Sequence, residues 1–255
     1  HIVEHHEFKL TFNDVLNAMP ALHNHLAEPF ADASLIPTSL VSFHTRQHVT
    51  VALSGDGGDE LFAGYWRYLG HYYLQRYRGI PAVFRRWLIE PLLAIAPSAK
   101  SGRILNRIRQ ARKLLRGNHD DPFERHAAWS MLGEQKAIAS LMRASSEIDL
   151  AKDLRDARDS IAPDANESDP LAALLYADLR FSLPADMLFK VDAASMLHAL
   201  EVRVPLLDRA VAEFAAPLPS RYKINRTHRK RLLRDAYRDV LPAEILDRPK
   251  MGFEV

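Results

Sequence analysis

Apolar and polar positions change their spacing several times in the first third of the chain. Thr11 followed by Asp14 is typical of a helix N-cap, and apolar residues then recur every three or four positions over residues 12–26. Ser34–His44 predicts a second helix, with a proline in its first turn. The β-branched run Val49–Leu53 is the clearest strand of the sequence, and it leads directly into a glycine-rich turn.

After Tyr65 the strand signals stop, and the pattern becomes helical. Helical spacing is clearest in three later segments: residues 171–179, 186–200 and 232–240. The order strand, glycine-rich turn, helix is the order found at α/β nucleotide sites. We therefore predict a partial α/β nucleotide-binding segment over residues 1–70 and a mostly helical remainder over residues 71–255.

Composition narrows the class of protein. The hydrophobic share of 47% and the charged share of 26% are those of a globular chain and exclude a collagen-like or disordered one. With 34 Lys and Arg against 32 Asp and Glu, the charge balance does not imply a polyanionic partner. The chain has no cysteine, which excludes disulfides, thiolate metal sites and a cysteine nucleophile. No apolar run approaches the ~20 residues of a membrane span, and we expect no membrane partner.

The turn Ser54–Glu60 carries the strongest chemical signal. Three of its residues are glycines, which let the backbone approach a ligand closely. Backbone amides at the start of the following helix favour an anion. The turn is not a Walker loop, a G-x-G-x-x-G turn or an EF-hand. It also fits a simple strand-to-helix turn capped by aspartates, and spacing alone leaves both interpretations open.

Acidic residues give the turn an unusual charge for a phosphate site. Asp56, Asp59 and Glu60 would repel a phosphate directly. They suit phosphate binding if Mg²⁺ bridges carboxylate and phosphate oxygens. If the turn binds a nucleotide, the pattern therefore indicates a site that works with a divalent cation.

The basic tract over residues 76–116 holds eleven Lys and Arg and one acid, Glu90. It could bind nucleic acid, but its interleaved apolar residues favour amphipathic helices with a solvated charged face. The acidic excess over residues 117–170 supports the second interpretation, so we do not expect a nucleic-acid partner.

Charged residues also accompany the predicted helix over residues 186–200. Lys190 and Asp192 lie near its start, and Arg203 and Asp208 follow its end. The latter segment favours a buried ion pair that joins two helices. The histidines near the N-terminus match no zinc-ligand spacing, so we predict no metal site there.

Four motifs, in this order, resemble the synthetase domain of glutamine-hydrolysing asparagine synthetases. They are VALSGDGGDELFAGY (51–65), LPADMLFKVDAASM (183–196), LEVRVPLLD (200–208) and RPKMGF (248–253). Each motif is moderately specific alone, and the four in register are highly specific. The resemblance covers nearly the whole chain and is weakest over residues 76–170.

The resemblance implies a fold and a reaction. The fold is an α/β, adenine nucleotide alpha-hydrolase-like domain of the ATP pyrophosphatase type, here mostly α-helical with few parallel strands. The reaction converts aspartate, ATP and glutamine-derived ammonia to asparagine, AMP and pyrophosphate through an acyl-adenylate, in the cytoplasm. ATP and Mg²⁺ would be the cofactors. The acceptor carboxylate stays open, because β-lactam-forming relatives share these motifs, and an oligomer is compatible with the sequence.

The resemblance also implies site residues. Ser54 and Gly55 would contact the nucleotide, and Asp56 would lie beside the acyl-adenylate, where the family often has the longer glutamate. Asp59 would hold Mg²⁺ on the pyrophosphate. Lys250 would stabilise the charge that develops on the α-phosphate, although a lone loop lysine is ordinarily solvated.

Two family features are absent from these residues. The sequence contains no Ser-Gly-Gly-x-Asp-Ser pyrophosphate loop and no amino-terminal glutaminase domain with its cysteine nucleophile. The chain also opens without methionine. We therefore expect the last part of a longer amidotransferase, inactive by itself. The alternatives are a non-catalytic homologue and a helical nucleic-acid-binding protein that uses residues 76–116.

Overall fold

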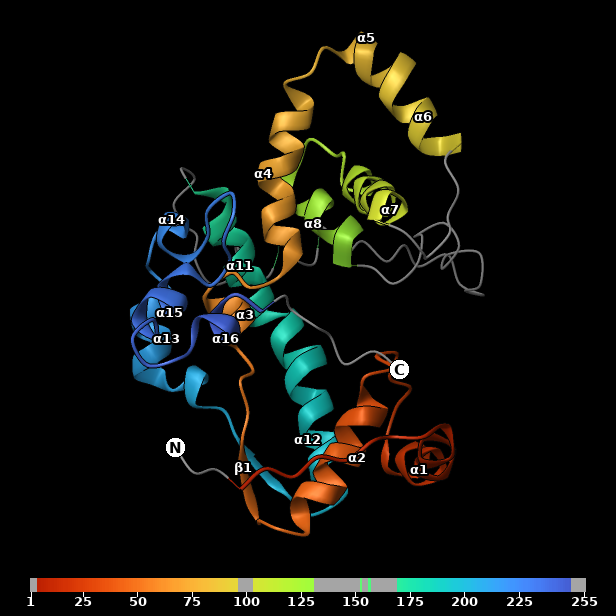
Figure 1. Cartoon of the computed structure of the whole chain (residues 1–255), viewed down its shortest axis with the longest axis vertical. Helices are drawn as coiled ribbons and strands as arrows, with labels where there is room; N and C mark the ends of the chain where they lie inside the picture. Colours follow the sequence, from red (N-terminus) through yellow and green to blue (C-terminus); the bar gives the residue numbers. More distant parts are fainter. Residues whose placement is uncertain (1–3, 96–102, 131–151, 153–155, 157–168, 249–255) are drawn as a thin grey trace. The chain divides into compact units, whose positions relative to one another are not determined.

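The computed structural model describes residues 4–95, 103–130, 152, 156 and 169–248, which divide between two compact units (Figure 1). Unit 1 is made of His1–Gly57, Ser182–Glu213 and Arg238–Val255, and unit 2 of Gly58–Phe181 and Phe214–Tyr237. Each unit therefore combines segments that lie far apart in the sequence.

Unit 1 contains a two-stranded sheet and several helices. Its elements are α1 (Phe12–His25), α2 (Leu35–Arg46), β1 (Val51–Leu53), the π-helical turn η2 (Leu183–Leu188), α12 (Phe189–Met196), β2 (Glu201–Arg203), the 3₁₀ turn η3 (Pro205–Leu207) and α16 (Ala243–Leu246), while α13 (Arg209–Ala215) begins in this unit.

The predicted cap of α1 is confirmed as a reciprocal capping box. The Asp14 amide donates to Thr11 Oγ1 at 3.3 Å, and the Thr11 amide donates to Asp14 Oδ2 at 2.7 Å. Two otherwise unsatisfied helix amides thus obtain acceptors. The apolar faces of α1, α2 and α12 then meet in a core around the buried Leu22, Leu35 and Ala194.

The sheet joins segments 150 residues apart in the sequence. β1 and β2 are parallel, with Val51 opposite Glu201 and Leu53 opposite Arg203. The strand expected over Val49–Leu53 is confirmed over Val51–Leu53, and so is a fold with few parallel strands. The expectation of no strand after Tyr65 was wrong, because the three-residue β2 is too short to show an alternating pattern.

The turn after β1 packs closely against η3. Gly57 has φ +79°, and a Cβ at this position would lie 2.2 Å from Leu207 Cδ2. Gly55 has no atom within 4 Å of its hypothetical Cβ. Gly57 is therefore required by its backbone conformation and by the small space beside Leu207, whereas the space around Gly55 is open.

Unit 2 is helical in its described residues. Its elements are α3 (Gly58–Leu61), α4 (Trp66–Arg78), α5 (Ala82–Phe84), the π-helical turn η1 (Arg85–Ile89), α6 (Glu90–Ile95), α7 (Arg103–Arg116), α8 (Pro122–Ser130), α11 (Pro170–Arg180), α14 (Ser220–Lys223) and α15 (Arg231–Ala236).

Several helix boundaries differ from those the sequence predicts; the helix predicted over residues 186–200, for example, ends at Met196. The helix after the glycine-rich turn ends at Leu61, because Ala63 adopts a left-handed conformation with φ 57°, and α4 begins afresh at Trp66. The helix predicted over residues 232–240 ends at Ala236. Around these breaks, buried apolar residues from α4, α11 and the chain after α14 form a core; they are Tyr68, Leu171, Leu175 and Ile224.

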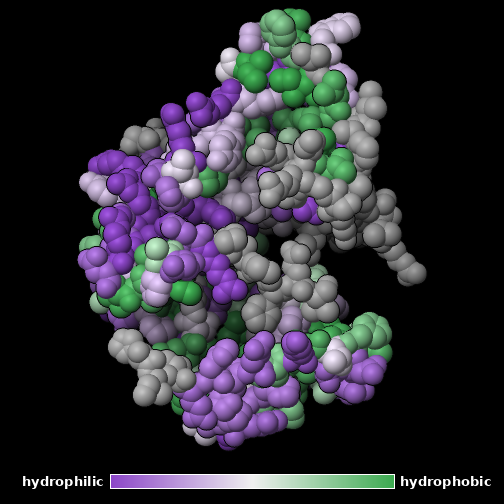
Figure 2. Space-filling view, in the orientation of Figure 1, coloured by the Kyte–Doolittle hydropathy of each residue, from purple (hydrophilic) through white to green (hydrophobic). Residues whose placement is uncertain are grey.

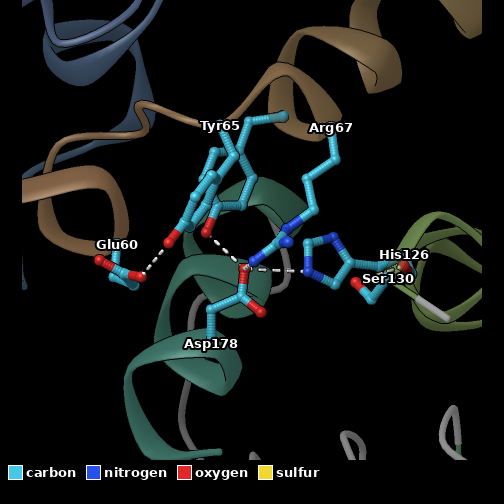
Figure 3. A network of polar contacts seen from close by, with 7 residues as sticks. Glu60, Tyr65, Arg67, His126, Ser130 and Asp178 are labelled. Carbon is cyan, nitrogen blue, oxygen red and sulfur yellow. Dashed lines mark hydrogen bonds and ion pairs between the residues drawn. The ribbon is translucent and has the colours of Figure 1, made fainter. Parts of the chain in front are cut away.

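A buried carboxylate gathers three donors in unit 2 (Figure 3). Asp178 on α11 accepts from Arg67 Nη2 at 3.0 Å and from His126 Nε2 at 2.9 Å, and Tyr68 Oη also donates to it. Asp178, Tyr68 and His126 are each fully buried. Burial acts to raise the pKa of Asp178, but His126 and Arg67 outweigh it and hold that pKa well below its usual range.

Apolar side chains gather on the surface of α5, η1 and α6 (Figure 2). Trp87 is 82% exposed and Leu92 is 69% exposed. The amphipathic packing expected for this tract is found in part, since Ile89 and Leu93 are half-buried, as are Leu105 and Ile108 on α7. No described helix combines the length and hydropathy that crossing a bilayer requires.

We predict that Asp178→Asn lowers the free energy of unfolding by about 3–5 kcal/mol, because it leaves Arg67 buried without a charge partner. Denaturant unfolding measures this loss. Asp156→Asn is the matched control, because its ion pair with Lys152 is solvent-exposed and is worth less than ~1 kcal/mol. Equal stability losses in the two variants would show that the Asp178 network is not a stabilising centre.

We predict that Gly57→Ala destabilises the protein by about 1–3 kcal/mol, through its positive φ and the contact with Leu207. Gly55→Ala should leave stability unchanged or raise it by less than ~1 kcal/mol, because the same methyl group enters open space. Thermal unfolding of the two variants checks the pair. A Gly57→Ala protein as stable as Gly55→Ala contradicts the packing described here.

Candidate functional site

The glycine-rich turn begins as a continuation of the sheet. The Ser54 amide donates to the carbonyl oxygen of Arg203 at 2.8 Å, so the strand pairing extends one residue past β1. Ser54 Oγ donates to Asp56 Oδ2 and accepts from the Asp56 amide at 3.4 Å. These contacts hold both side chains at the carboxyl end of β1, where ligands bind in open parallel sheets.

Three of the predicted site residues therefore lie together in unit 1: Ser54, Gly55 and Asp56. Gly55 is exposed, and Ser54 and Asp56 are half-buried. The open room around Gly55 leaves its backbone accessible to a ligand.

Asp59 lies three residues further on, in α3 of unit 2. Its Oδ1 is buried and lies 3.0 Å from Lys230 Nζ. Gly64 is packed against this pair, because a Cβ on it would lie 1.7 Å from Asp59 Oδ1. Lys230 adopts a left-handed conformation with φ 50° at the start of α15.

Lys230 is a partner that the sequence analysis missed. It stands in a run of basic residues 171 positions after Asp59, and nothing in that run distinguishes it from its neighbours. Arg229 reinforces the contact, since its Nη1 donates to the Gly64 carbonyl oxygen at 3.0 Å. The pairing of α3 with the segment before α15 is thus determined by the tertiary fold and not by a local sequence signal.

Glu60 faces the interior, unlike its acidic neighbours. It is 1% exposed, and Tyr65 Oη donates to its Oε1 at 2.6 Å (Figure 3). Burial raises the pKa of Glu60 despite this hydrogen bond. Glu60 therefore serves the packing of α3 against the start of α4 and is not available to a ligand.

Lys190 forms a second ion pair that only the structure reveals. Its Nζ donates to Asp32 Oδ2 at 2.6 Å within unit 1, and the lysine is only 8% exposed. Burial acts to raise the pKa of Asp32, but hydrogen bonds from Lys190 and Ser34 outweigh it and hold that pKa below its usual value. The position of Lys190 on a largely apolar helix was the one sequence signal for this pair.

The charged residues after α12 do not form the buried ion pair that the sequence favours. Arg203 pairs with Glu201 on the same strand, two residues before it, and both side chains are exposed. The buried ion pair expected at Arg203 is therefore absent from the described residues, because alternate residues of β2 point outward on one face. Asp208 instead accepts from the Ala210 amide at 2.9 Å. The last candidate, Lys250, lies outside the described residues.

The donor set at Asp59 can be compared with what Mg²⁺ requires. The described residues contain no group of three or more acidic or histidine side chains that could enclose a metal ion. Mg²⁺ at phosphate sites is usually held by one or two carboxylates together with phosphate oxygens and water. The Asp59 side chain is 20% exposed. A single accessible carboxylate fits that minimal set, with Lys230 as the cation already beside it.

Comparison with known proteins bears on the whole chain. The family model for asparagine synthase matches residues 1–255. A glutamine-hydrolysing asparagine synthetase of Bacillus subtilis is 28% identical over 242 residues, which cover 95% of this chain and 36% of that protein. A protein of Mycobacterium tuberculosis, provisionally named a glutamine-hydrolysing asparagine synthetase, is 34% identical over 255 residues, which cover 95% of this chain and 35% of that protein.

The chain thus spans about a third of the length of these curated relatives. A shorter match, 50% identical over 58 residues, links it to a protein of Methanocaldococcus jannaschii with a similar provisional name. No solved structure shows a significant match. The full-length match to the family model, in register with the four motifs, shows that the chain belongs to the asparagine synthase family.

Proposed function

We propose that this chain supplies the carboxylate-activating part of an ATP-dependent amidotransferase, which forms an amide through an acyl-adenylate. The observation that carries the proposal is the turn Ser54–Asp56, placed at the carboxyl end of β1 in a chain that matches the asparagine synthase family throughout. Aspartate is the proposed acceptor, glutamine the proposed source of ammonia, and the cytoplasm the proposed location.

Ser54 and Gly55 are the proposed nucleotide contacts. The Ser54 amide is already used by the sheet, but its hydroxyl and the exposed backbone of Gly55 are positioned at the end of the strand. A nucleotide needs close backbone approach there, which the open space around Gly55 supports.

Asp56 is proposed to act beside the acyl-adenylate. Its carboxylate is oriented by the Ser54 hydroxyl, which fixes a side chain that is one methylene shorter than the glutamate often found in the family. In this role it would orient the activated carboxylate and the attacking ammonia.

Asp59 is the proposed Mg²⁺ ligand. When bound, the cation would neutralise charge on the pyrophosphate leaving group. Lys230 Nζ lies 3.0 Å from the same carboxylate. Asp59 therefore has two explanations, as a metal ligand or as one half of a structural ion pair, and these can be separated by experiment.

We predict that Asp59→Asn lowers Mg²⁺-dependent pyrophosphate release by ~10²-fold or more, because one carboxylate ligand is lost. The assay measures pyrophosphate formed from ATP, aspartate and ammonia. It uses the longest natural form of the protein, since residues 1–255 hold no Ser-Gly-Gly-x-Asp-Ser loop.

Lys230→Met is the matched control for this prediction, because it breaks the same ion pair while keeping the carboxylate. We expect it to keep pyrophosphate release within about tenfold of the wild type. If both variants lose activity equally and also lose stability equally, Asp59 acts through its ion pair and the metal role is wrong.

In the longest natural form of the protein, we predict that Lys250→Ala lowers amide synthesis ~10²–10³-fold and leaves glutamine hydrolysis unchanged, because a fixed cation near the α-phosphate is lost. Lys250→Arg should restore synthesis only in part, since the guanidinium differs in shape and reach. Parallel assays of asparagine and glutamate formation measure both activities. Synthesis by the alanine variant within about threefold of wild type would make Lys250 a solvated bystander.

A further inference from the structure

Unit 2 contains a cavity of about 280 Å³ that the proposed reaction does not use. Its walls come from α4, the start of α8, the start of α11 and the first residue of α14. The volume is at the lower end for ligand pockets. The cavity therefore has room for a small organic molecule.

Arg125 places a nearly buried guanidinium in the wall of this cavity. The residue is 7% exposed, and its Nε and Nη2 donate to the carbonyl oxygen of His119 at 3.3 and 3.0 Å. Nη2 also donates to the Asp120 carbonyl oxygen at 3.2 Å. Within the described part of the chain no carboxylate forms an ion pair with Arg125, since the Asp120 side chain pairs with Arg78 at 2.9 Å.

His71 does not balance the charge of Arg125. Its Nδ1 lies 3.2 Å from Arg125 Nη1, and a guanidinium can only donate, so Nδ1 must be the acceptor of a neutral ring. Burial, His126 and Arg125 lower the pKa of His71 to about 2, in agreement with a neutral imidazole. Four of the five N–H groups of Arg125 then have acceptors, and one on Nη1 remains for a ligand.

Asp169 is the carboxylate on the cavity wall, and its charge is already compensated. Its Oδ2 accepts from the Ser220 amide at 2.8 Å, and its Oδ1 accepts from the Ala172 amide at 3.2 Å. Both amides belong to the starts of helices, which favour negative charge. Lys223, which is 2% exposed, also interacts electrostatically with Asp169.

Arg125 thus forms no ion pair in the part of the chain that the structure describes, although Asp120 and Asp121 act on it electrostatically, and a buried charge is costly unless it is paired. We propose that the cavity binds a small monoanionic carboxylate, held by Arg125 and assisted by the hydroxyl groups of Tyr72 and Ser220 on the wall. A singly charged carboxylate suits the one remaining N–H of Arg125, on a wall that also carries Asp169, better than a doubly charged phosphate does. The apolar walls at Pro122 and Leu171 suit a short hydrocarbon part.

Saturation-transfer NMR on the whole chain tests this inference with sodium acetate as the probe. Sodium chloride and sodium phosphate at matched ionic strength are the comparison anions. We expect saturable acetate binding with a dissociation constant in the millimolar range, which phosphate displaces only weakly. This inference is independent of the proposed function, and acetate binding is measured without ATP.

Two variants locate the binding. Gln75→Glu adds a negative charge to an exposed position on the cavity wall and should weaken acetate binding at least about tenfold. Gln110→Glu makes the same change on the exposed face of α7, away from the cavity lining, and should bind as the wild type does. Arg125→Met should abolish binding, and its unfolding curve shows separately whether it is folded.

Three results would overturn the proposal. They are the absence of saturable acetate binding, equal binding by the wild type and Gln75→Glu, and phosphate binding that is tighter than acetate binding. The first two would show that Arg125 only anchors the backbone before α8, and the third would assign the cavity to a different class of anion.

Discussion

The parallel pairing of β1 with β2 is the constraint on which the candidate site depends. Each strand has three residues, and together they connect parts of the chain that are 150 positions apart. The amide of Ser54 extends this pairing, and the close approach of Gly57 to Leu207 joins the turn to the segment after β2. The pairing with β2 and the contact with Leu207 therefore fix the backbone of the proposed nucleotide turn.

Unit 2 depends instead on a buried charge. Asp178 draws Arg67, Tyr68 and His126 to one point, and these come from α4, α8 and α11. Because a buried carboxylate is stable only with such donors, the helices cannot slide past one another without leaving it unsatisfied. Arg125 differs from Asp178, because its buried guanidinium donates to backbone carbonyl oxygens and to a neutral histidine.

Local signals in the sequence predicted local structure well. The capping box at Thr11, the strand before the glycine-rich turn and the helix of α11 follow from neighbouring residues. The second strand was missed because three residues carry no periodic pattern, and the break at Ala63 was missed because alanine normally favours helix. Lys230 and Asp32 could not be paired with Asp59 and Lys190 from sequence, since only the tertiary fold brings these charges together. The family resemblance supplied the roles of Ser54, Gly55, Asp56, Asp59 and Lys250, which remain proposals.

A crystal structure of the longest natural form with AMP, pyrophosphate and Mg²⁺ tests the central claim most directly. The claim is that the turn after β1 binds the nucleotide. It predicts density for the AMP phosphate against the Gly55 backbone and the Ser54 hydroxyl, with Mg²⁺ on Asp59. Well-defined nucleotide density away from Ser54–Asp59, or an Asp59 that keeps only Lys230 as its partner in that complex, would contradict it.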